Sequence, residues 1–428
     1  MGTELNELDI GSEIPTLAAF FESHPKARDY LHRSTERLFK SCGVDASEHL
    51  EAPDPDFLGA CHQLNELIQG SSQRFQNCET EVELITSYAT LVDEVNDICE
   101  SVLNLIKQKR VNPSHLIRFY EVLVPWICSD NFISNSFWRA RFSKEMLEDI
   151  DTEYPGSSFL MMLIRHFYKV KQDKNLLELR KTIPDIHMAC MLDRAALSVM
   201  QRTAWIGEKL VDYHHRGPLA QEPLFFLELA GGDGALSEDI LTRFLSGEDK
   251  ERFKNLTLID GDQRTLDETT FPRLNSLRDR IKEMALEVLH KNIFRDRKAI
   301  QTALKGKTIV ASIGFIDYAT NKWLSHMLKT IINEAQPGAS IALGVFKTNY
   351  PHEAFMRLIL QWELITRTED ELKTIAEEAG LSNVEVHGLA VEGDPNSVYQ
   401  LVLLGRTPTL KEREEEARLQ GAASSSNP

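Results

Sequence analysis

The chain has 428 residues, 42% of them apolar and 26% charged, and a formal net charge of −17 at pH 7. This length predicts roughly two or three folded domains. A surface this acidic argues against a broad interface with nucleic acid or anionic membranes, because both need clustered lysine and arginine. No apolar segment approaches the ~18 residues of a membrane-spanning helix, and the first residues lack the basic start and apolar run of a secretory signal. We therefore expect a cytoplasmic protein without membrane insertion and without a nucleic-acid partner.

The residues that commonly bind metals are scattered. All six cysteines precede residue 223, and none forms a C-x-x-C pair or a His/Cys cluster with zinc spacing. His214 and His215 are neighbours, and adjacent residues on a helix diverge by about a quarter turn or more, so they would not chelate one ion together. We expect buried free thiols, two solvated linker histidines and no metal site.

Residues 16–213 have helical period almost throughout, with helices expected at 27–40, 57–69, 81–107, 112–128, 137–150, 159–171 and 186–213. The helix at 81–107 carries an a/d seam over about three heptads. Its members are Leu84, Tyr88, Leu91, Val95, Ile98, Val102 and Leu105. The seam fits either a helix in an intramolecular bundle, which we favour, or a coiled coil that forms a homodimer through the N-terminal helices.

From residue 224 the pattern alternates between strands and helices. Strands are expected at 224–229, 256–260, 308–315, 339–346, 384–391 and 398–404, with a further strand placed at 281–285. Helices are expected between them at 235–245, 263–277, 322–335, 352–362 and 369–379. This alternation predicts an α/β, Rossmann-like, doubly wound, mainly parallel sheet. Only residues 392–396 separate the final two strands, so the last strand is expected to be antiparallel.

Three regions follow from these patterns. Residues 1–215 are expected to form an all-α N-terminal domain that acts as a lid and acceptor pocket or in oligomerisation. Residues 216–408 are expected to form the α/β domain, after a short junction at 216–223. Residues 409–428 are charged and then small and polar, which predicts a disordered tail.

The stretch PLFFLELAGGDG at 223–234 passes from a buried strand into a glycine turn. Such a turn, followed by a helix, places backbone N–H groups where a ligand can bind at the carboxyl ends of the strands. A dinucleotide G-x-G-x-x-G starting at Gly232 would need its third glycine at Ser237, and no G-K-[ST] of a P-loop follows. The loop therefore predicts a different nucleotide-like ligand.

An acid followed by glycines at alternate positions fits the loop, with Glu228, Ala230 in place of a first glycine, then Gly232 and Gly234. This series resembles the first motif of class I S-adenosylmethionine-dependent methyltransferases, acid-x-Gly-x-Gly-x-Gly. A second feature agrees with it, because Asp260 ends the next strand 26 residues after Gly234, where a carboxylate can accept both ribose hydroxyls.

The resemblance implies S-adenosyl-L-methionine as the cofactor. It places the glycine loop, Gly231 included, against the cofactor, Glu228 near its methionine end and Asp260 on its ribose. It makes Met284 and Ala285, at the end of the expected third strand, neighbours of the adenine. Asp260 could instead cap the helix at 263–277, a role that Asp262 could equally fill.

A second resemblance covers residues 309–406. The succession IGFIDYA, PGASIALGVFK and MRLILQWELITRTEDEL is similar to bacterial methyltransferases of 3-hydroxypalmitic acid methyl ester (extracellular factor) biosynthesis. The corresponding elements here are Asp317, Tyr318, Trp362, Arg367 and Thr368. The R-G-Y-A-G-D segment common in the N-terminal half of that group has no counterpart in this chain, so the resemblance carries over the cofactor and leaves the fatty-acid substrate open.

The end of the expected fourth strand, from Ile313 to Tyr318, should lie beside the transferred methyl group. Asp317 and Tyr318 are therefore candidates for positioning the acceptor or the sulfonium, although Asp317 could instead cap the next helix. Arg367 could anchor an acceptor carboxylate or simply face solvent. An ionised carboxylate acceptor needs no general base, whereas a hydroxyl or amine would need one, for which Tyr318, Asp317 and His352 are candidates.

Three functions are consistent with the sequence. The first is methyl transfer to a small-molecule acceptor, as O-methylation of a carboxylate or hydroxyl. The second is a protein or peptide methyltransferase whose acidic helical half docks a basic partner. The third is a non-catalytic binding or scaffold protein assembled through the helix at 81–107.

Overall fold

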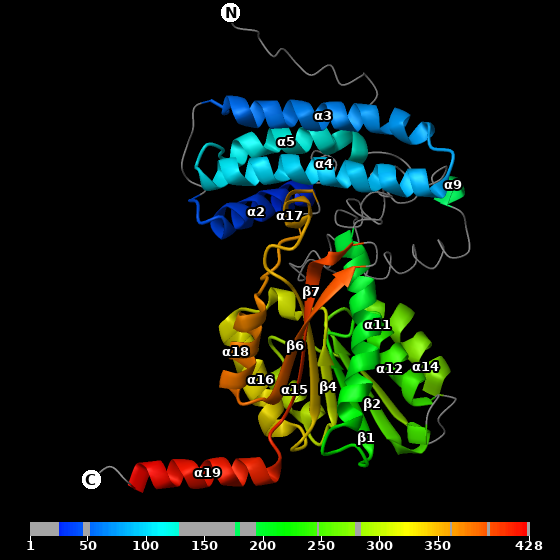
Figure 1. Ribbon diagram of the computed structural model, residues 1–428, viewed down its shortest axis with the longest axis vertical. Helices are drawn as coiled ribbons and strands as arrows, with labels where there is room; N and C mark the ends of the chain where they lie inside the picture. The colour runs from blue at the N-terminus through cyan, green and yellow to red at the C-terminus, as the bar shows by residue number, and fades with distance from the viewer. Residues whose placement is uncertain are drawn as a thin grey trace, which may run out of the picture. The chain divides into compact units, whose positions relative to one another are not determined.

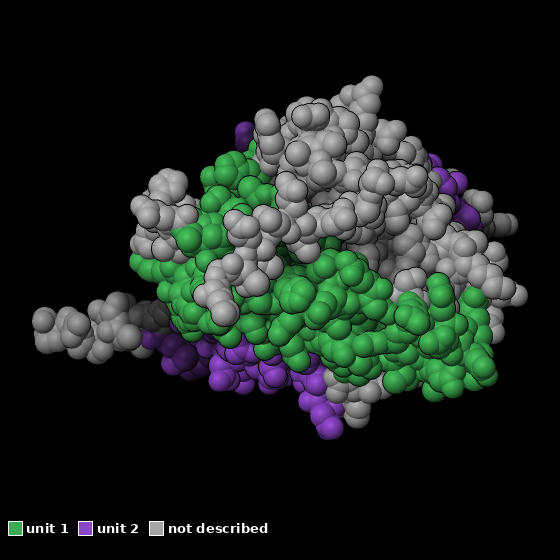
Figure 2. Space-filling view, turned by 90° about the horizontal axis from the view of Figure 1, so that it is seen from above, with its two compact units in different colours: residues 1–155, 163–196, 352–363 green, residues 156–162, 197–351, 364–428 purple. Residues whose placement is uncertain are grey.

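A computed structural model of the chain describes residues 25–45, 52–127, 176–179, 194–245, 248–278, 284–359, 362–391 and 394–425. The expected helices at 137–150 and 159–171, and the first part of the one at 186–213, lie outside these residues. The chain divides into two compact units, coloured separately in Figure 2. We call them the helical unit, which holds the described residues up to 196 and those of 352–363, and the sheet unit, which holds the described residues of 197–351 and 364–425.

The helical unit contains α2 (Pro25–Ser41), α3 (Pro55–Gln76), α4 (Glu81–Lys107), α5 (Pro113–Ile127), α9 (Leu176–Leu179) and α17 (Glu353–Leu358). Helix α4 begins at a capping box, in which Thr80 and Glu83 each bind the backbone N–H of the other. All seven residues of its apolar seam are buried inside the unit, and Tyr88 stacks on Phe75 of α3 with ring centroids 4.2 Å apart. This burial favours the intramolecular bundle over a coiled coil formed through the same seam.

Helix α17 joins the helical unit although it comes late in the chain. Its cap His352 places Nε2 2.8 Å from Oδ1 of Asp93 on α4, and the N–H of Phe355 donates to Oδ1 of Asn96 on α4 at 3.1 Å. Arg357 donates to Oγ of Ser41 at the end of α2. The connection that leaves the sheet after residue 351 therefore folds into the helical unit before it returns at residue 364.

The boundary between the two units lies earlier in the chain than the expected residue 215. Helix α11 (Arg194–His215) passes into the sheet unit from Leu197 onward, because Ile206, Leu210 and Tyr213 pack into the core of that unit. His214 is 1% exposed and its Nδ1 lies 3.2 Å from Oγ of Ser340, so the expectation of a solvated linker histidine is wrong for this residue.

The sheet unit is built on seven strands in the order β3-β2-β1-β4-β5-β7-β6. They are β1 (Leu224–Leu229), β2 (Phe253–Asp260), β3 (Ala285–His290), β4 (Ile309–Ser312), β5 (Ser340–Phe346), β6 (Ser382–Val391) and β7 (Asp394–Arg406). Strands β1 to β5 pair in parallel, and β7 runs antiparallel to both of its neighbours. The predicted fold class is confirmed.

Helices cover both faces of the sheet, as Figure 1 shows. Helices α11, α12 (Ala235–Leu245) and α14 (Phe271–Arg278) pack on one face, and α15 (Arg297–Leu304), α16 (Asn321–Glu334) and α18 (Glu369–Ala379) pack on the other. Strand β1 feeds both cores, with Leu224 and Phe226 in the first and Leu227 and Leu229 in the second. This alternation places Glu228 on the face that α12 covers.

Strand β3 occupies 285–290, four residues later than the 281–285 expected from sequence. It lies at an edge of the sheet, and its residues alternate between exposed and half-buried positions. Such a strand lacks the continuous apolar run that marks the buried strands, which explains the misplacement. Helix α15, which comes after it, was not expected from sequence.

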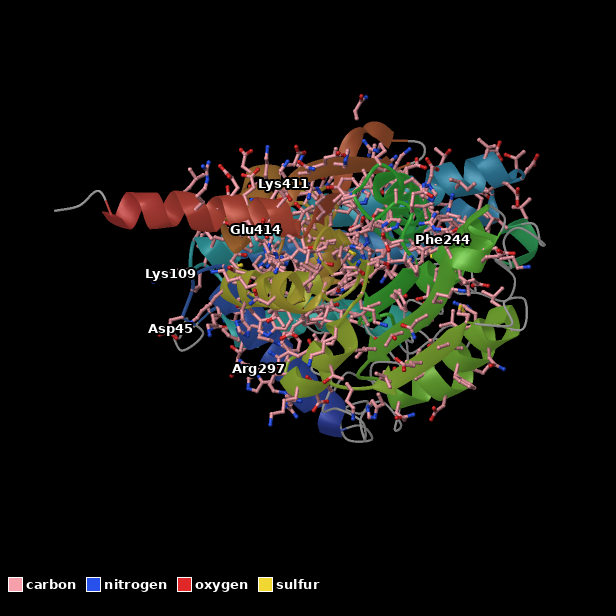
Figure 3. The ribbon with its side chains drawn as sticks, turned by 90° about the horizontal axis from the view of Figure 1, so that it is seen from below. Asp45, Lys109, Phe244, Arg297, Lys411 and Glu414 are labelled. Carbon is pink, nitrogen blue, oxygen red and sulfur yellow. The ribbon has the colours of Figure 1, made fainter. Side chains whose placement is uncertain are left out.

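The C-terminal segment is also ordered where disorder was expected, because residues 410–425 form α19. Arg406 makes a two-pronged ion pair with Glu412, and Thr409 and Glu412 cap the helix through their side chains. Arg413 donates to the carbonyl of Ile332 on α16 at 2.7 Å. Most of the other side chains between Lys411 and Leu419 are exposed, among them Lys411 and Glu414 (Figure 3). Hydrogen bonds and an ion pair of its first turn therefore hold this helix in place, although it buries little apolar surface.

One buried lysine lies at the amino end of the sheet. Lys307 precedes β4 and is 6% exposed, and its ammonium donates to Oγ1 of Thr257 at 2.7 Å and to Oδ1 of Asn255. Burial lowers the pKa of Lys307 to about 8, against a smaller opposing effect of Glu287. The folded protein therefore releases this proton at a lower pH than the unfolded chain does.

This pKa predicts a specific dependence of stability on pH. Between pH ~8 and ~10.5 the unfolded chain still holds the proton that folded Lys307 has lost, so the free energy of unfolding should rise through this window by up to about 3 kcal/mol. Below pH ~8 both states are protonated and this contribution is absent. Urea unfolding of the wild type should show the rise relative to Lys307→Met, whereas the exposed control Lys305→Met should parallel the wild type. Parallel curves for wild type and Lys307→Met would contradict the prediction.

Candidate functional site

The candidate site lies at the carboxyl ends of the parallel strands. The strand order reverses between β1 and β4. The next strand after β1, which is β2, lies on the side of β1 away from β4, and the next strand after β4, which is β5, lies on the side of β4 away from β1. Loops that leave the two strands at such a point diverge, so ligands bind there in doubly wound sheets. The hydroxyl of Ser312, at the end of β4, donates to the carbonyl of Leu229, at the end of β1, at 3.0 Å. The two strand ends are thus held together below the loops.

The glycine loop, residues 230–234, needs backbone conformations that favour glycine. Gly232 and Gly234 have φ of 51° and 73°, and Ala230 also adopts a positive φ, 52°. Gly231 is required for a different reason, because a Cβ on it would lie 2.6 Å from the side chain of Leu258. The loop therefore depends on glycine for its backbone conformation at Gly232 and Gly234 and for close packing on β2 at Gly231.

Glu228 ties the glycine loop to the helix after it. It is 1% exposed, and its Oε2 accepts the backbone N–H of Ser237 at 3.1 Å and the hydroxyl of the same residue. Ser237 lies in the first turn of α12, where backbone N–H groups lack partners within the helix. Ser237, which stands where a dinucleotide fingerprint has its third glycine, is thus buried and bound to Glu228.

Asp260 joins the end of β2 to the glycine loop. Its Oδ2 accepts the N–H of Gly232 at 2.8 Å, and its Oδ1 accepts the N–H of Asp262 at 2.9 Å. The residue is 8% exposed, and burial raises the pKa of its carboxyl against the lowering effect of these hydrogen bonds. Asp262 is the residue that caps the next helix, by accepting the N–H of Thr265 at 3.2 Å. The alternative of a capping role for Asp260 is therefore wrong.

The helix expected at 263–277 is divided into α13 (Gln263–Thr265), a π-helical turn η2 (Leu266–Thr270) and α14. The hydroxyl of Thr270 donates to the carbonyl of Gly232 at 2.6 Å, and Arg273 donates to the carbonyl of Asp233 at 2.9 Å. Sequence reasoning missed both residues, because a helical pattern with ordinary spacing gives no sign of a π turn.

The loop after β3 also reaches Asp260. The N–H of Lys291 donates to the carbonyl of Asp260 at 2.9 Å, and Nε2 of His290 lies 2.9 Å from the carbonyl of Gly261. Met284 and Ala285 lie at the other end of this strand, since Ala285 pairs with Asn255 in the first half of β2. Their expected place beside an adenine is therefore wrong, and the cause is the four-residue misplacement of β3.

The loop after β4 lies next to the glycine loop. Ile313 is 7% exposed, and a Cβ on the adjacent Gly314 would lie 4.0 Å from the carbonyl of Ala230. Residues 316–318 form the short 3-10 helix η3 (Ile316–Tyr318), which holds both Asp317 and Tyr318. The structure thus brings Ile313, Asp317 and Tyr318 to the same end of the sheet as the glycine loop.

Asp317 is turned into the protein rather than toward a ligand. It is 3% exposed, and its carboxylate accepts the N–H of Phe346 at 2.7 Å and lies 3.6 Å from Nη1 of Arg202 on α11. Burial raises the pKa of Asp317, and Arg202 opposes this effect. Thr320 caps α16, so Asp317 does not serve as that cap. Both oxygens of Asp317 are occupied in bracing β4 to β5 and α11, which does not fit the predicted role of a general base.

Arg367 is likewise a bracing residue. It is 1% exposed, and its guanidinium donates to the carbonyls of Ile316 and Ala319 and to Oδ1 of Asn321. Burial lowers the pKa of Arg367, although Asp317 opposes this. A guanidinium committed to these acceptors does not fit the predicted anchoring of an acceptor carboxylate. Tyr318, which is half-buried, is the member of the predicted catalytic set that this bracing leaves as a candidate.

Two further residues of the second resemblance also have structural roles. Thr368 caps α18 in a capping box with Glu371. Trp362 is 5% exposed, belongs to the helical unit and donates its backbone N–H to the carbonyl of Met356. Within the described residues no group of three or more His, Cys, Asp or Glu side chains could hold a metal ion. No described helix is both long and apolar enough to span a membrane.

No protein-family model matches the chain, and no curated protein matches it. Among solved structures, a possible exported protein from Bordetella parapertussis is similar, with 14% identity and a TM-score of 0.41 over 53% of this chain and 74% of the other. Magnesium protoporphyrin IX methyltransferase from Synechocystis PCC 6803 has 11% identity and a TM-score of 0.36, over 50% and 85% of the two chains. The 1,6-didemethyltoxoflavin-N1-methyltransferase of Burkholderia thailandensis has 16% identity and a TM-score of 0.33, over 47% and 78%. Values this low establish neither an activity nor a ligand for this chain.

Proposed function

We propose that the sheet unit binds S-adenosyl-L-methionine and that the protein transfers its methyl group to a small molecule. The observation that carries the proposal is the contact between Asp260 and the glycine loop, at the point where the strand order reverses. A nucleoside with an amino-acid tail needs an acceptor pair for its ribose hydroxyls and exposed backbone for its tail. The carboxyl ends of β1 and β2 offer both.

The residues present fit this cofactor. Each oxygen of Asp260 accepts one backbone N–H and keeps a further lone pair, so the carboxylate can also accept from two neighbouring hydroxyls. Two added donors would compensate the burial that now raises its pKa. Gly231, where a side chain would collide with Leu258 of β2, lets the glycine loop pack closely on that strand. A triphosphate fits less well, because the loop carries no lysine.

Bound S-adenosyl-L-methionine supplies an electrophilic methyl group on a sulfonium. The chain must then hold an acceptor oxygen in line with that methyl group and exclude water, which accounts for most of the rate of such a displacement. We assign the positioning of the acceptor to Tyr318. Its turn, η3, is fixed by the carboxylate of Asp317 on one side and the guanidinium of Arg367 on the other. A carboxylate acceptor needs no base here, and a hydroxyl acceptor could pass its proton to Tyr318 only if that phenol were ionised.

We assign recognition of the acceptor to the helical unit. The chain leaves the carboxyl end of β5, forms α17 within the helical unit and returns to α18. The helical unit is therefore linked covalently to the strand end beside η3 as well as to α11. O-methylation of a carboxylate or hydroxyl is the proposed reaction. A carboxylate suits the site better, because Asp317, the carboxylate near Tyr318, is not available as the base that a hydroxyl or an amine would need.

Replacement of Asp260 tests the proposed cofactor. Asp260→Ala should weaken the binding of S-adenosylhomocysteine, measured by titration calorimetry, by at least about tenfold, since it removes two charge-assisted hydrogen bonds to the ribose. Asp54→Ala is the matched control, because Asp54 also accepts a backbone N–H and pairs with an arginine, but lies in the helical unit. The control should bind as the wild type does. Absence of binding by the wild type would refute the proposed function.

The raised pKa of Asp260 predicts how this affinity depends on pH. Only the ionised carboxylate accepts from both hydroxyls, so acidification should weaken binding at a pH above that of an ordinary aspartate, whose pKa is about 4. Calorimetric titrations between pH 7.5 and about 4.5 should show constant affinity at the upper end and a progressive loss toward the lower end. Asp260→Asn should bind more weakly at neutral pH and lose this dependence. An equal pH dependence in wild type and Asp260→Asn would assign the titration to another group.

A further inference from the structure

We propose that Thr270 and Arg273 form a latch that sets the conformation of the glycine loop and so controls cofactor affinity. The effect on affinity rests on the proposed function, whereas the effect on the loop itself does not. Both residues come from the segment after β2, and neither belongs to the glycine motif. They would act as positioning residues, through the backbone of Gly232 and Asp233.

The peptide groups of Gly232 are held from two sides by one stretch of chain. Its N–H donates to Asp260 at the end of β2, and its carbonyl accepts from the hydroxyl of Thr270, ten residues later. The same hydroxyl lies 3.1 Å from the carbonyl of Thr265, farther than the 2.6 Å to Gly232, so the loop carbonyl is the nearer of its two acceptors. The side chain of Thr270 also closes on Gly234, where an added Cβ would lie 3.0 Å from its Cγ2.

Arg273 holds the next residue of the loop. Its guanidinium donates to the carbonyl of Asp233 at 2.9 Å and to the carboxylate of Asp233 at 3.1 Å, and lies 3.4 Å from the carboxylate of Glu238 on α12. Asp233 is 2% exposed, so its carboxylate cannot rely on water for compensation. The arginine thus connects the loop with the helices on both sides of it.

The π-helical turn explains how two residues of one helix reach the loop. Turn η2 contains one residue more than an α-helical turn, and the N–H of Phe271 returns to the carbonyl of Leu266. The extra residue rotates the helical residues after it, so Thr270 and Arg273, three apart, face the loop while Leu274 stays in the core. A π turn costs hydrogen-bond geometry, and here it places a hydroxyl on the carbonyl of Gly232.

The latch is needed because the loop contains costly conformations. Ala230 holds a positive φ without being glycine, and Gly232 and Gly234 have no side chains to restrict them. Without outside contacts such a loop would populate many conformations, and a ligand would bind only the competent fraction. Fixing the carbonyls of Gly232 and Asp233 leaves fewer conformations and so raises that fraction.

Thr270→Val tests the proposal, since it removes the hydroxyl and nearly keeps the volume. We expect the affinity for S-adenosylhomocysteine to fall about tenfold, and Thr270→Ser, which keeps the hydroxyl, to restore most of it. Arg273→Met should give a smaller loss, about threefold, because this side chain is partly exposed. The matched control is Thr308→Val, at the amino end of β4, where a buried threonine also bonds backbone groups. It should lower the melting temperature without changing affinity.

Hydrogen exchange of the ligand-free protein provides a second measurement. The amides of residues 231–234 should exchange faster in Thr270→Val than in the wild type, Thr270→Ser or Thr308→Val. Unchanged exchange and unchanged affinity in Thr270→Val would overturn the latch, as would an equal loss of affinity in Thr308→Val. If the wild type itself failed to bind S-adenosylhomocysteine, the proposed function would fall, while the exchange measurement would still decide whether Thr270 holds the loop.

Discussion

Three buried carboxylates hold the carboxyl end of the sheet together. Glu228 accepts from Ser237 at the start of α12, Asp260 from Gly232 in the glycine loop, and Asp317 from Phe346 at the end of β5. A buried carboxylate is costly unless donors surround it, and backbone N–H groups in loops need acceptors. Each acid meets both needs at once. The loops at this end of the sheet therefore have fixed shapes, and any ligand there meets groups that are already in place.

The three carboxylates differ in what they leave for a ligand. Asp317 lies between an N–H and an arginine and has no role left beyond bracing. Asp260 accepts two backbone N–H groups, which are neutral donors, and burial still raises its pKa. Further donors would therefore stabilise Asp260 more than Asp317. Asp260 is therefore a candidate binding group, whereas Asp317, which is also an aspartate, has a structural role.

The helical unit is not a simple N-terminal addition to the sheet unit. Residues 352–363 follow β5 and belong to the helical unit, where His352 and Phe355 bind α4 and Arg357 binds Ser41 at the end of α2. The apolar side chains of α17 are buried in the helical unit. In sequence, residues 352–363 of the helical unit lie between two parts of the sheet unit. Neither unit is therefore a contiguous stretch of the chain.

Much of the fold could be predicted because local patterns specify it. Helices α4 and α18 begin where their capping residues place them, α12 follows its apolar spacing, and β1 and β5 are mainly apolar. Such elements are decided by neighbours in sequence. Strand β3 was placed four residues too early because its residues are only half-buried or exposed, so no apolar run marks it. Helix α19 escaped prediction because side-chain hydrogen bonds and ion pairs hold it.

The sequence by itself determined the glycine loop, the strand acid Glu228 and the position of Asp260 at a strand end, because each follows from spacing along one β-α-β unit. Only the tertiary structure decided what each polar residue contacts. Arg367 and Asp317 resemble ligand-binding residues until their partners, Ile316 and Phe346, are known. Thr270 resembles an ordinary helix residue until a π turn directs it to Gly232. A residue's type gives its chemistry, whereas its partners come from chain segments that no local pattern can bring together.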